Sequence, residues 1–527
     1  MRHHRKHPRY SELQVEALER RLNLAGNVVV ALSGSTLSVT GDDSANSVEI
    51  VQTGAAQLTV SGFKTGPGQV QTNLSFKGVV ATETGPGTNI FTINLAGPIS
   101  LKANMKGGAD ELTLGDSGGA FVSSVTSLSV DMGAGMDELN IEKAAVTGSG
   151  ATSISLGGDN DYDYFSAVDV TAANSAVTIK SGNGYGYVNI DNSSNLAASF
   201  KSLTINGGNH GDSVYLSGVN VTTATTISTG SDYDYVSTNN LTTGTLKAQL
   251  GSGDDTFYGY GLTVNATTGT TLIDLSSGND RAYFSTGLAN PLIKNSLTIS
   301  GGAGENDTSV YNTTVQGALT VTGSNEYDEL NVGSSTISGS LTANLGAGDN
   351  EVNLNSTNVA ANIAVTTGKG DDNVYMDTTT AAAVSLKLGA GENYVELTDV
   401  YKAGLTQLTS LLIETGAGFD VLKLDGVLSA KTDVKVGDGD NTVNVTGSTL
   451  GNLTFVSGKG VDNLVVDALI AAITDIKLGA GNDVVNASNS TFTTSLKVDG
   501  GAGTDTLTDG GGNTGAGFTG IVTVSIP

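Results

Sequence analysis

The sequence contains no cysteine and no tryptophan, and only six of its 527 residues are proline. Without cysteine the chain supplies no disulfide framework, no thiol nucleophile and no thiolate metal site. So little proline excludes a collagen-like chain despite 72 glycines, and 38% hydrophobic residues are too many for a disordered one. No run of 18 apolar residues occurs, so no membrane-spanning helix is expected. The composition therefore indicates a packed protein built from small residues and short apolar runs.

Positive charge is also scarce. The chain has 25 basic and 52 acidic residues, a formal net charge of −27. Three of its four histidines lie in the first seven residues, which leaves His210 alone in the rest of the sequence. An acidic body repels nucleic acid and anionic membranes and attracts divalent cations or basic partners. We therefore expect no nucleic-acid partner.

A glycine-rich acidic motif recurs along most of the chain. It reads GSGDDTF from residue 251, GAGDNEV from 346 and GAGNDVV from 479. Successive copies are 21 to 27 residues apart, about 23 on average, and about eighteen can be placed. A tight corner of this kind needs positive φ, which glycine adopts at little steric cost. The members expected at the motif's anchoring position are Asp110, Asp137, Asp161, Gly186, Asp212, Asp234, Asp255, Asp280, Asp307, Asp328, Asn350, Asp372, Asn393, Asp420, Asn441, Asp462, Asp483 and Asp505.

Between the corners, apolar residues alternate with polar ones as in half-buried strands. Three short strands in about 22 residues form one coil, and stacked coils close a continuous core that no single coil could bury. The sequence thus predicts an all-β fold, a three-sided parallel β-helix (β-solenoid) of about 18 coils of 21–27 residues with a short N-terminal helix. Residues expected to point inward are Leu345, Val352, Leu354, Val374, Leu388, Val395, Leu422, Val443, Leu464 and Val485.

The ends of the chain differ from the repeat. Residues 1–25 form a basic tail and an amphipathic helix over 11–25, which either caps the open end of the solenoid or serves in sorting. Residues 26–100 are expected to form atypical first coils, residues 101–509 the repeat array, and residues 510–527 a C-terminal capping strand.

The segment VEALERRLNLAGNVVV resembles the N-terminal signature of large planctomycete surface and secreted proteins, in which a Leu-Glu-x-Arg-x-Leu-Leu-Ala-Gly-type motif precedes the first strand. The resemblance covers some 40 residues and implies export, with an extracellular or cell-surface location, but no chemistry. Asn23 stands where leucine is more usual. The matching residues are Leu18, Glu19, Arg21, Leu24, Ala25, Gly26 and Asn27.

The acidic corners loosely resemble calcium-binding toxin-type repeats, although their motif recurs every nine residues and here it comes once per coil. Clustered acids supply the oxygen ligands that Ca²⁺ takes. A column of turns relieved by the interspersed asparagines explains the same pattern without a metal, and both interpretations stay open. The candidate metal ligands are Asp159, Asp161, Asp163, Asp254, Asp255, Asp371 and Asp372.

Tyrosines gather at outward positions of the coils between residues 160 and 285. Stacked coils would turn them into an aromatic stripe that either stiffens the rod or binds a polysaccharide or another surface component. The expected members are Tyr162, Tyr164, Tyr185, Tyr187, Tyr215, Tyr233, Tyr235, Tyr258 and Tyr283, with Tyr162, Tyr164, Tyr185, Tyr187, Tyr233 and Tyr235 as candidate partner-binding residues.

No pattern in the sequence points to catalysis. The acids form a periodic column, no coil is long enough to build the walls of a deep cleft, and His210 has no recognisable nucleophile or metal partner nearby in the sequence. We expect a non-catalytic extracellular or cell-surface structural protein, a surface layer, matrix, fibre or adhesin rod, with self-association end to end or side by side. The alternative is a carbohydrate-active β-helix, either a polysaccharide lyase or a carbohydrate-binding module.

Overall fold

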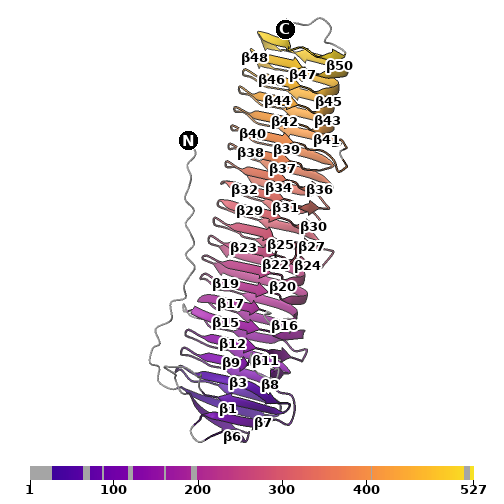
Figure 1. Cartoon of the computed structure of the whole chain (residues 1–527). Helices are drawn as coiled ribbons and strands as arrows, with labels where there is room; N and C mark the ends of the chain where they lie inside the picture. The colour runs from indigo at the N-terminus through magenta and orange to yellow at the C-terminus, as the bar shows by residue number, and fades with distance from the viewer. Residues whose placement is uncertain are drawn as a thin grey trace.

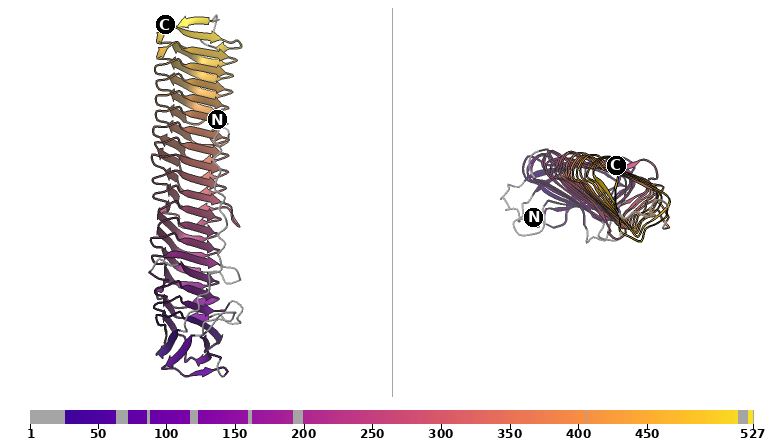
Figure 2. Two further views of the ribbon diagram at one scale, coloured as in Figure 1. Left: turned by 90° about the vertical axis from the view of Figure 1, so that its left-hand side faces the viewer. Right: turned by 90° about the horizontal axis from the view of Figure 1, so that it is seen from above.

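The computed structural model of the chain is a straight rod of stacked coils (Figure 1). It describes residues 26–62, 72–85, 88–116, 123–158, 162–191, 199–404, 406–515 and 523–526. The coils form a parallel β-solenoid of about seventeen turns, one fewer than expected. Figure 2 shows that the coils overlie one another along the axis and enclose a flattened interior. The described residues contain no helix, and the helix predicted over 11–25 lies outside them.

One coil from the middle of the rod illustrates the others. It contains β35 (Glu351–Asn355), the short β36 (Asn358–Val359) and β37 (Asn362–Thr367). β35 pairs in parallel with β32 (Asp328–Gly333) and β38 (Asn373–Asp377) of the neighbouring coils. β36 and β37 pair in the same way within a second sheet of 29 strands. Each coil therefore places its glycine-rich corner directly over the corner of the previous coil.

Both ends of the rod leave the parallel pattern. β1 (Asn27–Ser33) pairs antiparallel with β2 (Thr36–Thr40), and β4 (Gln57–Ser61) pairs antiparallel with β7 (Ile90–Asn94). At the other end β54 (Thr523–Ile526) pairs antiparallel with β52 (Asp505–Asp509). These strands occupy sheet edges that would otherwise be free to pair with another chain.

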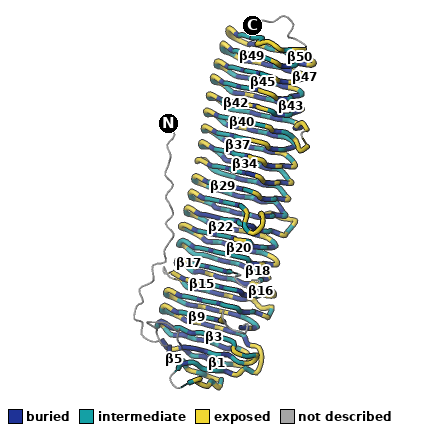
Figure 3. Tube along the Cα trace, in the orientation of Figure 1, coloured by how far each residue is buried: buried dark blue, intermediate teal, exposed yellow. Residues whose placement is uncertain are grey.

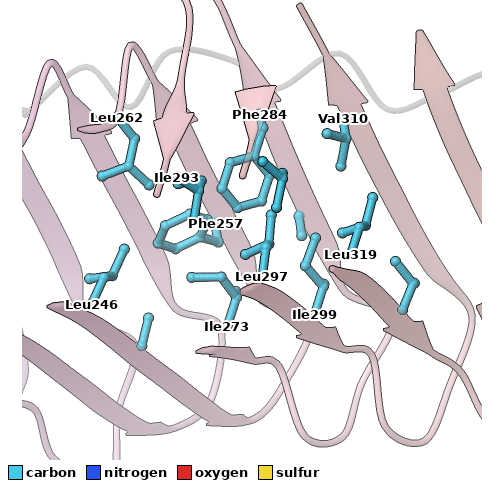
Figure 4. Packing of buried hydrophobic residues seen from close by; sticks show 14 of the residues in the cluster. Leu246, Phe257, Leu262, Ile273, Phe284, Ile293, Leu297, Ile299, Val310 and Leu319 are labelled. Atoms are coloured by element: carbon cyan, nitrogen blue, oxygen red, sulfur yellow. The ribbon is translucent and has the colours of Figure 1, made fainter. Parts of the chain in front are cut away.

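Burial alternates along nearly every strand, which gives the banded pattern of Figure 3. All ten residues predicted to point inward are buried, so that prediction is confirmed. Figure 4 shows Phe257 and Phe284 packed in the interior beside Ile293 and Leu297, and the ring centroids of the two phenylalanines lie 5.6 Å apart. Gly259 pairs with Phe284, and a Cβ atom on Gly259 would lie 2.8 Å from the Phe284 ring. The interior is therefore filled by side chains and holds no open channel along these coils.

A second corner of the coil turns at one residue with a left-handed backbone. Thr378 has φ 49° and Ala468 has φ 52°, and residues at the same place in other coils have similar values. Left-handed φ is strained for a residue with a Cβ atom and most strained for a β-branched one. The coils therefore carry a small strain wherever this place is not glycine or asparagine.

Replacing Thr378 by asparagine is expected to raise the free energy of unfolding by roughly 1 kcal/mol, because asparagine tolerates left-handed φ. The Thr378 hydroxyl donates a 3.0 Å hydrogen bond to Asp377 Oδ1, and an amide can also donate. Thr398→Asn is the matched control, since Thr398 lies in β40 (Tyr394–Thr398) with ordinary strand φ. The control should be neutral or slightly destabilising in urea unfolding, and equal effects of the two changes would contradict the strain.

Candidate functional site

The acidic corner places its two successive acids on opposite sides of the chain. Asp255 and Asp372 are buried, with 1% and 0% of their surface exposed, whereas Asp254 and Asp371 are exposed to solvent. This follows from strand geometry, since neighbouring side chains point to opposite faces. The two carboxylates of each pair therefore do not converge on a common site.

The buried acids and asparagines form one column along the inside of the corner, which we call the inner column. The predicted anchoring residues are the members of this column at most coils, but at two coils the predicted residue is one or two positions away from the actual member. Asp163, and not Asp161, pairs with Gly186, and Asn306, and not Asp307, pairs with Asp328. Residues 159–161 lie outside the described part of the chain. The inner column consists of Asp110, Asp137, Asp163, Asp212, Asp234, Asp255, Asp280, Asn306, Asp328, Asn350, Asp372, Asn393, Asp420, Asn441, Asp462, Asp483 and Asp505.

Each member of the inner column accepts a hydrogen bond from the previous coil. The Asp234 backbone N–H donates to Asp255 Oδ1 at 2.8 Å, and the Asp255 N–H donates to Asp280 Oδ1 at 2.7 Å. The same bond recurs near the C-terminal end, from Asp462 N–H to Asp483 Oδ1 at 2.8 Å. A buried peptide N–H without a partner is costly, so these side chains supply the acceptor that the corner lacks.

From Asp328 to Asp462 the inner column alternates aspartate with asparagine. The Asn393 amide donates to Asp420 Oδ1 at 2.8 Å and to the carbonyls of Gly389 and Gly391 at 3.1 and 3.2 Å. Thr415 donates to the other carboxylate oxygen, Asp420 Oδ2, at 2.7 Å. Both oxygens of Asp420 therefore have donors, which is the arrangement that an ionised buried carboxylate needs.

Elsewhere aspartates follow one another without asparagine between them. Burial raises the pKa of Asp234 to about 8 and the pKa values of Asp255 and Asp280 to about 7. The Oδ2 atoms of Asp255 and Asp280 are buried and have no hydrogen-bond partner. The residue five places before Asp420 is Thr415, which supplies a hydroxyl donor. The residue five places before Asp255 is Leu250 and that before Asp280 is Leu275, and neither has a hydroxyl. These aspartates therefore lie where the neutral, protonated form is favoured.

The exposed acids make a second, outer set of bonds in the opposite direction along the rod. The Asn279 backbone N–H donates to Asp254 Oδ1 at 2.9 Å, and the Glu392 N–H donates to Asp371 Oδ1 at 2.7 Å. Each exposed carboxylate thus ties its corner to the next coil. No group of three acidic or histidine side chains arranged to hold a metal occurs among the residues that the structure describes. Calcium binding stays a prediction.

Replacing Asp254 or Asp371 by asparagine tests the calcium prediction, since an amide oxygen keeps the N–H bond but is a weaker calcium ligand. We expect each change to alter the free energy of unfolding by less than about 1 kcal/mol, equally with millimolar calcium and with excess chelator. A loss of several degrees in melting temperature that appears only when calcium is present would favour metal ligation.

The tyrosines form a continuous outer column on the sheet that follows the corner. Tyr162, Tyr164, Tyr185 and Tyr233 are exposed, and the other predicted members are half-buried. Ring centroids of successive members lie 4.9 to 6.0 Å apart. The tyrosine column, as we call it, consists of Tyr164, Tyr187, Tyr215, Tyr235, Tyr258, Tyr283 and Tyr311.

Tyr311 and Tyr260 were missed by the sequence analysis. Tyr260 stacks on Tyr258 at 5.3 Å. Both occupy outward positions on their strands, so strand alternation carried the signal. A second, shorter stack joins Tyr162, Tyr185 and His210, with centroids 4.7 and 5.1 Å apart. This accounts for His210 as a packing residue on the surface of the rod.

Stacking decides which part of the rings meets solvent. The planes of Tyr164 and Tyr187 differ by only 8°, and those of Tyr162 and Tyr185 by 15°. Their faces therefore cover one another, and edges and hydroxyl groups point outward. Burial and the neighbouring tyrosines raise the pKa of Tyr235 to about 12, so its hydroxyl keeps its proton. The column can donate and accept hydrogen bonds along its length.

On four of its strands the tyrosine column has nearly uncharged surroundings, although the whole chain is acidic and the ion pair Arg281–Asp307 lies at its Tyr283–Tyr311 end. The strands concerned are β17 (Tyr185–Asp191), β19 (Ser213–Ser217), β21 (Tyr235–Asn239) and β23 (Thr256–Tyr260). Their outward residues are tyrosine, serine, asparagine and threonine, with Asp191 as the one charged side chain. This face therefore repels anionic partners less than the rest of the rod does.

Comparison with known proteins found no match to a family model, to a curated protein or to a solved structure. In the described ranges no helix has the length and hydropathy to cross a membrane.

Proposed function

We propose that the chain is a non-catalytic structural rod of the cell surface or extracellular space, which serves as a spacer or scaffold in a surface layer, matrix, fibre or adhesin. The observation that carries the proposal is that the acidic side chains of the corners hold adjacent coils together. Both the inner column and the exposed acids bond backbone N–H groups of adjacent coils, so the carboxylates are engaged in holding the stack together. About seventeen turns at about 4.8 Å each give a rod of roughly 80 Å.

Side-by-side association suits such a rod better than end-to-end association. Near the two ends antiparallel strands cover edges on which another parallel coil would stack, as β4 does on β3 (Ser47–Gly54) and β54 does on β52. Long sides with exposed polar and aromatic residues remain for lateral contacts. The proposed surface location rests on the N-terminal resemblance around Leu18 to Asn27.

The location is tested by electron microscopy of labelled protein on intact cells, together with mass spectrometry of the mature N-terminus. We expect label on the cell surface or in the matrix. Label confined to the cell interior would overturn the proposal. Purified protein should give no turnover on acidic polysaccharides, and turnover abolished by substituting one acid would establish the lyase alternative instead.

A carbohydrate-binding rod is the second candidate, and the uncharged tyrosine-rich face favours it over a lyase. Hydroxyl groups and ring edges repeat there once per coil, as a chain of neutral sugars lying along the rod requires. A shallow groove beside Tyr401 also presents hydroxyl groups, from Ser356 and Thr380, and none of the residues lining it is acidic or basic. Neither surface carries the paired acids of a polysaccharide-cleaving site.

Affinity electrophoresis in gels containing neutral or acidic polysaccharide tests this candidate. The double variant Tyr185→Ser with Tyr187→Ser should lose retardation in the neutral gel. The matched control is Tyr375→Ser with Tyr394→Ser, a neighbouring pair on the same sheet whose ring centroids lie 5.4 Å apart and near which Glu351 and Glu396 lie. Retardation lost equally in both double variants, or absent in the parent, would remove this candidate.

A further inference from the structure

The last three members of the inner column, Asp462, Asp483 and Asp505, follow one another without an asparagine between them. All three are buried, with at most 1% of their surface exposed. Asp462 N–H donates to Asp483 Oδ1 at 2.8 Å, and Asp483 N–H donates to Asp505 Oδ1 at 2.9 Å. The Oδ2 atoms of the three side chains are buried without a hydrogen-bond partner. These coils therefore contain buried carboxylate oxygens without a donor, whereas both oxygens of Asp420 in the alternating stretch have one.

The asparagine one coil earlier shows which role is missing. The Asn441 amide nitrogen donates to Asp462 Oδ1 at 2.8 Å and to the carbonyls of Gly437 and Gly439 at 3.3 and 3.0 Å. An aspartate at this place has Oδ2 where asparagine has its amide nitrogen. Its surroundings repeat, because glycines again precede Asp483 by two and four residues and another aspartate follows in the next coil. The groups around Oδ2 are thus acceptors, and an ionised carboxylate has no proton to offer them.

Two donors that support other aspartates of the column are absent at Asp483. Asp420 has the Asn393 amide on one oxygen and the Thr415 hydroxyl on the other. At Asp483 the preceding member of the inner column is Asp462, where Asp420 has Asn393. The residue five places before Asp483 is Leu478, where Asp420 has Thr415. Leu478 is fully buried and has no hydroxyl to offer. A negative charge on Asp483 would be left uncompensated in an apolar interior.

From these contacts we infer that Asp483 is a neutral carboxylic acid in the folded rod, with Oδ2–H in the donor role of an asparagine amide, and that the coils from Asp462 to Asp505 form a pH-sensitive segment. Below about pH 6, folding of these coils then takes up a proton that the unfolded chain has already released. The stretch of the inner column from Asp328 to Asn441, where asparagine alternates with aspartate, needs no such proton.

The charges near Asp483 strengthen this assignment. Burial, together with the smaller effect of the Asp462 and Asp505 carboxyl groups, raises the pKa of Asp483 to about 6, although the hydrogen bond from the Asp462 N–H lowers it. The basic groups on the adjoining coils, Lys459, Lys477 and Lys497, are exposed to solvent, and the first two have acidic partners. Lys477 lies 3.7 Å from Asp475, and Lys459 lies 3.5 Å from Asp438. No cation in the described coils next to Asp483 therefore offsets a charge on its side chain.

The sign of the pH dependence follows from this assignment. A carboxyl whose pKa is raised in the folded state contributes its full stability below its unfolded value and loses it as the pH rises through the folded value. With a folded pKa of about 6 and an ordinary unfolded value, the local opening constant should rise roughly tenfold between pH 5 and pH 8.

Hydrogen exchange of the full chain tests the inference, because a repeat protein can open locally at one end. After correction for intrinsic exchange, backbone amides of residues 459–509 should lose about tenfold protection from pH 5 to pH 8. Asp483→Asn should abolish this loss and should protect these coils better at pH 8. Asp420→Asn, the matched control at a carboxylate with both donors, should leave their pH dependence unchanged.

Infrared spectroscopy gives a second reading that does not depend on the stability of a variant. A protonated carboxyl has a C=O stretch distinct from that of carboxylate. Other buried aspartates of the inner column also give such a signal, so the difference spectrum of the parent minus Asp483→Asn is the measurement. At about pH 5.5, just below the folded pKa, it should contain a buried C=O band from one carboxyl that titrates above its ordinary range. Protection independent of pH in the parent, or an infrared signal unchanged by Asp483→Asn, would overturn the assignment. So would an Asp483→Asn variant that lowers protection at every pH.

Discussion

Raising the pH from about 4 to about 8 is expected to destabilise the middle coils of the rod, from Asp212 to Asp280. Burial raises the pKa of Asp212 to about 6, of Asp255 and Asp280 to about 7 and of Asp234 to about 8. Below the ordinary value near 4 both the folded and unfolded states hold these protons, and stability is complete. Between that value and the folded values only the unfolded chain releases them, so stability falls and then levels off above about pH 8.

The expected size is roughly 2 kcal/mol per aspartate, several kcal/mol over the four coils. This is less than the full value of about 1.4 kcal/mol per pKa unit for each residue, because neighbouring carboxyls in the column share protons and titrate together. Hydrogen exchange at about pH 5, 6.5 and 8 measures it peptide by peptide. Peptides from residues 345–425, where asparagine alternates with aspartate, are the internal control and should change much less.

A single substitution converts the middle run into the alternating pattern. Asp255→Asn places an asparagine between Asp234 and Asp280, with Asn306 next in the column, the same alternation that runs from Asp328 to Asp462. The new amide can donate to Asp280 Oδ1 as Asn393 does to Asp420. We expect this variant to be more stable than the parent at pH 8 by about 1 to 2 kcal/mol and to have a flatter pH profile. A variant less stable at pH 8, or middle coils that gain protection as the pH rises, would contradict the protonated column.

The repeat itself was predictable because its physical causes are local. Glycine at the corners and alternation in the strands fix the coil and its interior, and Leu345, Val374 and Val485 are buried as expected. The same alternation contained the answer for the acidic pairs. Val374 points inward, so Asp372 two residues earlier must point inward too, and Asp371 must point out. Treating both acids of a pair as ligands overlooked this.

Other features depend on contacts that no local pattern reveals. The antiparallel pairing of β4 with β7 joins residues far apart in the sequence, such as Leu58 and Ile93. The sequence of neither strand indicates which strand it pairs with. The error at Asn306 is of another kind, because Asn306 ends a GAGEN segment just as Asn393 does and could have been placed from the sequence. The predicted member, Asp307, instead accepts a hydrogen bond from Arg281 on the surface at 2.8 Å. The protonation of the column depends on which side chain lies in the next coil, which is visible only once the coils are in register.

Replacing Gly391 by alanine is expected to be among the most destabilising single changes in the rod. Gly391 is a corner glycine with φ +152°, and a Cβ atom there would lie 1.9 Å from the carbonyl oxygen of Gly370 in the coil below. Neither group can move without breaking the stack, because the Gly391 N–H bonds the Ala417 carbonyl at 3.0 Å and the Gly370 N–H bonds the Ala390 carbonyl at 3.0 Å.

Gly269→Ala separates the two causes of that loss. Gly269 also has positive φ, +86°, but no atom lies within 4 Å of a Cβ placed on it. The free energy of unfolding of Gly269→Ala should fall by only about 1 kcal/mol, the cost of positive φ for alanine. That of Gly391→Ala should fall by about 3 kcal/mol or more, because the clash with backbone adds to this strain. Urea unfolding followed by hydrogen exchange compares them, with the loss in Gly391→Ala centred on the coils between residues 368 and 420. If the two variants lost equal stability, the close stacking of the corner glycines would not be what holds adjacent coils in register.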